Sequence, residues 1–126
     1  MKSAYLVSLA PTFEDDVWRA ATELGAQVRD GVAQVHDEQD RLLTVFGGLD
    51  EKHAPDWRDD LVASPSLAAV PDLGTSTAVA VECRSEELFA SWVGRLAGLL
   101  PEAAWVVDGD GVVWPAGEVD PQAVRL

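Results

Sequence analysis

The sequence has few of the residues that form crosslinks or bind nucleic acid. It has one cysteine, Cys83, which excludes an internal disulfide and suits a reducing cytosol. Only nine residues are Lys or Arg, against 22 Asp and Glu, and the formal net charge is −13. A surface this negative repels phosphate backbones and anionic lipids, so we expect no nucleic-acid partner and no membrane partner.

Long hydrophobic runs are also missing. None approaches the roughly 20 apolar residues that a membrane-spanning helix needs. The short apolar stretch near the start turns acidic from Glu14 onwards, which is unlike a signal peptide. Hydrophobic residues still make up 48% of the 126 positions, enough to form a core. We therefore expect a single α+β domain over residues 1–126, located in the cytoplasm.

The two halves of the sequence are predicted to contain the same order of secondary structure elements. The first half is predicted to hold a strand, a helix and the two strands of a hairpin, at residues 4–9, 13–24, 32–35 and 42–46. The second half is predicted to repeat that order, at residues 77–83, 86–100, 104–107 and 112–114. Thr12 and Ser85 are the expected N-caps. An alternative turn for the first hairpin lies at Asp30-Gly31.

This repetition predicts the fold class. We expect two β-α-β-β units that form one mostly antiparallel sheet, with two helices packed on one face. The halves span residues 3–48 and 76–116, and a long loop over residues 47–76 joins them. Loops of this length inside a compact domain are uncommon and often functional.

The stretch VVDGDGVVW, residues 106–114, begins like a calcium-binding loop. Such a loop needs further oxygen ligands at positions that Val112 and Val119 occupy here, so we interpret Asp108 to Gly111 as a hairpin turn. His36 and His53 lie on separate loops, at no spacing typical of a metal site. Cys83 ends an apolar strand, and no serine lies in a nucleophile motif. The sequence thus predicts no metal, no cofactor and no enzyme activity.

Acidic residues gather between residues 37 and 60, where Trp57 lies among them. Aromatic residues surrounded by charge are favoured in protein interfaces. The alternative is that Trp57 folds down over the core. The predicted partner-binding residues are Asp37, Glu38, Asp40, Asp50, Glu51, Asp56, Trp57, Asp59 and Asp60.

A small, acidic, cysteine-poor α+β chain with DEQDR and PDWRDD loops resembles the immunity proteins of bacterial polymorphic toxin systems. The resemblance implies a non-enzymatic cytosolic protein that binds and blocks one cognate toxin, often a basic nuclease. A basic partner would also fit the charge of −13. The alternative is a small-molecule binding or sensing domain, with a tryptophan-lined pocket between the helices and the sheet.

Overall fold

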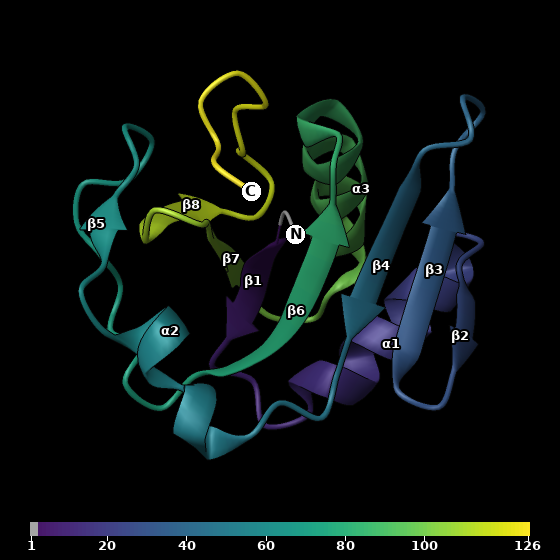
Figure 1. The fold of residues 1–126 in the computed structure, drawn as a ribbon. Coiled ribbons are helices and arrows are strands. Elements are labelled where there is room, and N and C mark those ends of the chain that lie inside the picture. Colours follow the sequence, from purple (N-terminus) through teal and green to yellow (C-terminus); the bar gives the residue numbers. More distant parts are fainter. Residues whose placement is uncertain (1–2) are drawn as a thin grey trace.

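The computed structural model describes residues 3–126 and has a single eight-stranded sheet as its centre (Figure 1). The sheet order is β2-β3-β4-β6-β1-β7-β8-β5. All neighbouring strands are antiparallel except β5 and β8, which are parallel. The α+β class and the mostly antiparallel sheet are therefore confirmed. In chain order the elements are β1 (Ser3–Ser8), α1 (Phe13–Glu23), β2 (Gln27–Arg29), β3 (Val32–His36), β4 (Leu42–Phe46), the 3-10 helix η1 (Glu51–His53), α2 (Pro55–Arg58), β5 (Val62–Ala63), β6 (Thr77–Cys83), α3 (Glu86–Leu99), β7 (Ala104–Val107) and β8 (Val112–Pro115).

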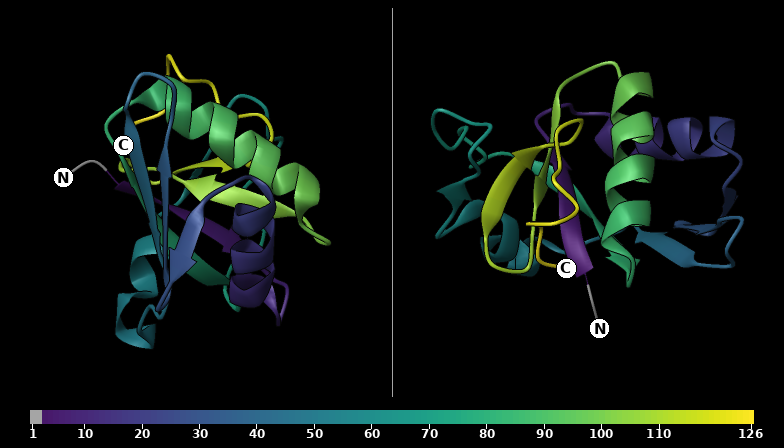
Figure 2. Two further views of the ribbon diagram at one scale, coloured as in Figure 1. Left: turned by 90° about the vertical axis from the view of Figure 1, so that its right-hand side faces the viewer. Right: turned by 90° about the horizontal axis from the view of Figure 1, so that it is seen from above.

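The main core lies between α1, α3 and the sheet face behind the strands in Figure 1, and the left view of Figure 2 shows both helices on that one side of the sheet. In α1, the buried apolar residues recur at helical spacing, from Phe13 to Ala21, while the first turn is acidic. In α3, Phe89, Trp92 and Val93 are completely buried. Ser85 caps α3 by accepting a hydrogen bond from the Leu88 amide, as predicted. Thr12 does not cap α1, because its hydroxyl donates to the carboxylate of Asp16 instead.

The first half holds one strand more than the sequence predicts. Both candidate hairpin turns form: Asp30 and Gly31, with φ of 53° and 75°, join β2 to β3, and a second turn joins β3 to β4. Strand β2 has only three residues, two of them polar, which is too short to show alternation. Residues 47–76 are likewise not a plain loop, because they contain η1, α2 and β5.

The turns of the hairpins β3–β4 and β7–β8 have the same hydrogen bonds. The Oδ1 atom of Asp37 accepts from the amides of Gln39 and Arg41, at 3.0 and 2.8 Å. The Oδ1 atom of Asp108 accepts from the amides two and four residues on, at 2.9 and 3.0 Å. The fourth residue of each turn, Asp40 or Gly111, has a positive φ. The DGDG stretch is therefore a hairpin turn, as its sequence predicts.

Two glycine substitutions test the backbone geometry, because they should change the free energy of unfolding in opposite directions. Gly94 lies within α3 and has open space around it, so Gly94→Ala should raise the free energy of unfolding by about 0.5–1 kcal/mol. Gly111 has a φ of +78°, and a Cβ there would lie 3.2 Å from the Asp60 carbonyl oxygen. Gly111→Ala should lower the free energy of unfolding by about 1–2 kcal/mol. Urea unfolding of the two variants measures both, and equal signs would contradict the assigned backbone geometry.

Candidate functional site

The predicted partner-binding residues do not form one cluster. Asp37, Glu38 and Asp40 lie in the turn before β4, whereas the other six lie between residues 50 and 60, in and around η1 and α2. These two groups are at opposite ends of β4 (Figure 1). The sequence places them in one acidic region, but β4 separates them by its full length in space. Seven of the nine are exposed: Glu38, Asp40, Asp50, Glu51, Asp56, Asp59 and Asp60.

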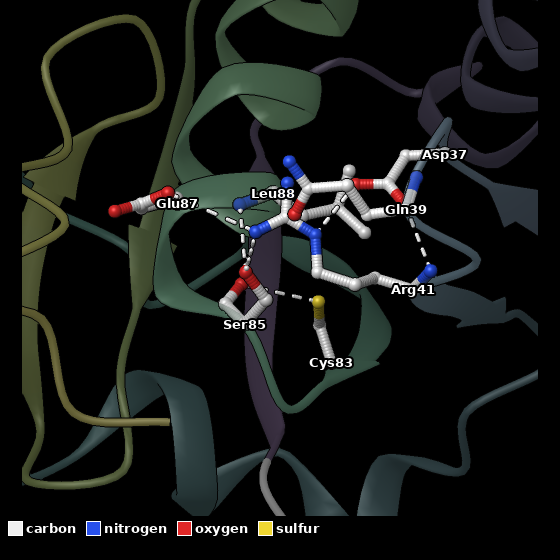
Figure 3. Close-up of polar contacts among 7 residues, drawn as sticks. All are labelled: Asp37, Gln39, Arg41, Cys83, Ser85, Glu87 and Leu88. Carbon is white, nitrogen blue, oxygen red and sulfur yellow. Dashed lines mark hydrogen bonds and ion pairs between the residues drawn. The ribbon is translucent and has the colours of Figure 1, made fainter.

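The β3–β4 turn is tied to the start of α3 through Arg41, as Figure 3 shows. The Arg41 Nε donates to Asp37 Oδ2 at 2.6 Å, and its Nη1 donates to the Ser85 hydroxyl at 3.0 Å. The same Nη1 lies 3.7 Å from the Glu87 carboxylate. The Arg41 side chain thus fixes the acidic turn against the start of α3. The sequence pattern did not reveal this contact, because Arg41 and Ser85 are 44 positions apart.

Asp37 makes the stability of this turn depend on pH. Hydrogen bonds from the Arg41 amide, the Arg41 side chain and the Gln39 amide hold the pKa of the Asp37 carboxyl below its ordinary value of 3.8. A lowered folded pKa gives stability that is present above the unfolded pKa and is lost as the pH falls through the folded value. The advantage of the natural protein over Asp37→Asn should therefore be constant near neutrality and shrink below about pH 4. Unfolding in urea across the acid range measures it, with Glu38→Gln as the control. A difference that does not change with pH would contradict the assignment.

Trp57 does not lie on the surface. It is 2% exposed, and its ring packs against Tyr5 with 5.2 Å between ring centroids. Arg58 lies over the ring, 5.9 Å from its centroid, and also donates to the Ser76 carbonyl oxygen. An exposed anchor at Trp57 is therefore wrong, and the alternative of a lid over the core is the arrangement found. The physical reason is that Val7, Leu73 and neighbouring apolar residues form a second core on this face of the sheet.

Several acidic residues around α2 take part in the fold. The Tyr5 hydroxyl donates to Asp56 at 3.0 Å, and burial, followed by this bond, raises the pKa of Tyr5. Glu51 accepts from Arg58 at 2.9 Å. Of the eight acidic residues predicted to bind a partner, four make no side-chain contact within the described residues: Glu38 and Asp40 at one end of β4, and Asp59 and Asp60 at the other. Those four carboxylates are free to meet a partner.

Cys83 has the environment of a structural thiol. It is 4% exposed at the end of β6, and its Sγ donates to the Ser85 carbonyl oxygen. Burial raises its pKa, so the thiol stays protonated at neutral pH and is a poor nucleophile.

The predicted tryptophan-lined pocket between helices and sheet is not found within residues 3–126, because Trp92 and Trp114 are packed in the main core. A groove of about 690 Å³ lies instead beside β4 and β6, next to Leu42 and Glu82.

Similarity to known proteins assigns no activity to this geometry. The chain matches no family model, no curated protein and no solved structure. Within residues 3–126, no three His, Cys, Asp or Glu side chains come together as metal ligands would. No helix in the same range has the length and apolar character to cross a membrane. The surface of the molecule is therefore the basis for inferring its function.

Proposed function

We propose that this protein is a non-enzymatic binding protein for a basic protein partner, and specifically a bacterial immunity protein that neutralises a cognate toxin. The observation that carries the proposal is the net charge of −13, together with uncompensated carboxylates at both ends of β4. A field of this sign raises the rate at which a basic protein associates. It also repels acidic proteins, which gives the surface selectivity.

The acidic residues contribute mainly to the encounter. Exposed ion pairs are worth only about 0–1 kcal/mol each, since water and salt screen them. Lysine and arginine side chains of the partner would be attracted to both ends of β4. The carboxylates are those of Glu38 and Asp40 at one end and of Asp59 and Asp60 at the other. The toxin is neutralised when the bound protein covers its active site or an adjoining surface.

The test of the immunity role is co-expression with the product of the open reading frame next to this gene. That product should stop growth when it is expressed alone, and growth should return when the two are made together. The two purified proteins should then form a complex. If the neighbouring product is neither toxic nor bound, the immunity role fails.

Salt tests the electrostatic part of the proposal. The association rate of the complex should fall at least several-fold between low and physiological ionic strength. The double variant Glu38→Gln, Asp40→Asn should slow association several-fold, because it removes two free carboxylates beside β4. The matched control, Glu102→Gln with Glu118→Gln, removes two exposed charges elsewhere and should change the rate less. Stopped-flow fluorescence measures these rates, and an association rate that ignores salt would contradict steering.

A further inference from the structure

One half of the sheet is uncovered on the face opposite α1 and α3. Side chains alternate along a strand, and Leu43, Val45, Val79 and Val81 point into the main core. Their neighbours in β3, β4 and β6 therefore point away from the helices. On that face, apolar residues of the segment 47–76, among them Trp57 and Leu73, pack against residues of β1, β6, β7 and β8. Figure 1 shows the front of β3 and β4 with no other described element over it.

The apolar residues of this face lie toward the two ends of β4, and the row between them, Gln34, Thr44 and Glu82, is polar. Val32, Phe46 and Ala80 lie side by side across β3, β4 and β6, and Leu42 lies at the other end of β4. None of these four residues belongs to either buried core or packs against one. Leu42 is 44% exposed and borders the groove of about 690 Å³. Leu42 is the exposed one of the four, and a contact made outside the chain would remove its apolar surface from water.

Two acidic residues, Asp40 and Glu82, border the same groove as Leu42. Glu82 lies on the same face, level with Thr44 in β4, and its carboxylate has no partner within the described residues. Asp40 lines the groove beside Leu42. Arg41 also lines it, but Asp37 and Glu87 balance its charge, and Arg84 adds one further positive charge. An exposed apolar side chain beside charged groups that lack partners is a feature of protein interfaces.

We propose that the open face of β3, β4 and β6 is the surface that binds the basic partner. An apolar side chain of the partner packs over Leu42 in the groove, and lysine or arginine side chains beside it pair with Glu82 and Asp40. This inference rests on the proposed function and gives it an apolar anchor, Leu42, in the role that Trp57 cannot fill. A second copy of the chain is a poor occupant, since each copy carries a charge of −13.

The test uses a probe that does not depend on any toxin. A synthetic peptide with two central leucines, flanked on each side by two lysines, is titrated into the isotope-labelled protein and followed by amide NMR. We expect the largest shift changes at Leu42, Thr44 and Glu82. A peptide with serine in place of leucine, or glutamate in place of lysine, should bind at least several-fold more weakly.

Two leucines of equal exposure provide the matched variants. Leu42 is 44% exposed on the open sheet face, and Leu99 is 45% exposed at the end of α3. Leu42→Lys should weaken binding of the peptide about tenfold, because it removes the anchor and repels the lysines. Leu99→Lys should leave the affinity within about twofold. Urea unfolding of both variants checks that each remains folded.

Several other outcomes would overturn the inference. No shift changes at millimolar peptide would show that the face does not accept this chemistry. Changes centred on α3 or β2, or equal losses in the two leucine variants, would place binding elsewhere. A dimer that sedimentation detects and Leu42→Lys dissociates would identify a second copy as the occupant. A neighbouring gene product that is inert, with the peptide still bound at Leu42, would reject the immunity role and leave the surface intact.

Discussion

Replacing Asp108 by alanine is expected to lower the free energy of unfolding by about 3–5 kcal/mol, although the residue lies in a turn. Asp108 is 5% exposed. Its Oδ1 accepts from two amides of its own turn, and its Oδ2 accepts from the Trp114 indole and the Arg125 amide, each at 3.2 Å. Alanine would leave four donors without an acceptor. It would also remove the hydrogen bond from the Arg125 amide to this turn, while the Gly109 amide still donates to the Arg125 carbonyl oxygen.

Two further variants make this prediction sharper. Asp108→Asn keeps one oxygen but turns an amide group toward the donors of Trp114 and Arg125, so it should lose a large part of the same stability. Asp110→Ala changes an exposed side chain in the same turn and should stay within about 0.5 kcal/mol of the natural protein. Urea unfolding followed by tryptophan fluorescence measures all three. A loss at Asp108 no larger than at Asp110 would show that the carboxylate does not organise the turn.

Replacing Trp57 by alanine should also cost about 3–5 kcal/mol, the usual loss for a large aromatic residue removed from a core. The ring fills the space between Tyr5 and the apolar residues of the second core. Without it, the segment 47–76 would keep Arg58 and its bond to Ser76 but lose its main apolar contact. The segment should then open locally before the sheet unfolds.

Limited proteolysis separates this structural role from a binding role. Trp57→Ala should be cut within residues 47–76 at a protease concentration that leaves the natural protein intact. Trp57→Phe keeps an aromatic ring beside Tyr5 and should show an intermediate effect. If Trp57→Ala is as stable as the natural protein and fails only to bind a partner, Trp57 is an anchor and its packing contributes little.

Local patterns along the chain predicted most of the elements but not their arrangement. Alternation and helical spacing located α1, α3 and the main strands, because each buries one regular face. The likeness of Asp37 and Asp108 is visible in the sequence, since both open a turn that needs a side-chain acceptor. Strand β2 was missed because three residues carry no periodicity. The pairing of β1 with β6 and β7 joins segments far apart in sequence, which no local pattern specifies.

The candidate site was harder to predict than the fold. Charge is a property of composition, so the acidic residues around β4 could be identified without a structure. The sequence left the burial of Trp57 as one of two alternatives, because that burial depends on Val7, Ala78 and Val107, which come from three separate strands. Leu42 was assigned only as part of a strand. Leu42 is exposed because the segment 47–76 packs over the other half of the sheet and does not cover β4.

The position of β1 between β6 and β7 affects the order in which this chain can fold. Strand β1 pairs with β6 on one side and β7 on the other, so the two halves of the sequence interleave. During synthesis on the ribosome, residues 4–8 therefore have no strand to pair with until residues 77–83 have left the exit tunnel. The first half cannot become a stable unit by itself, because β4 also needs β6. Because the sheet depends on these distant contacts, we expect folding to be slow and the nascent chain to be exposed to aggregation.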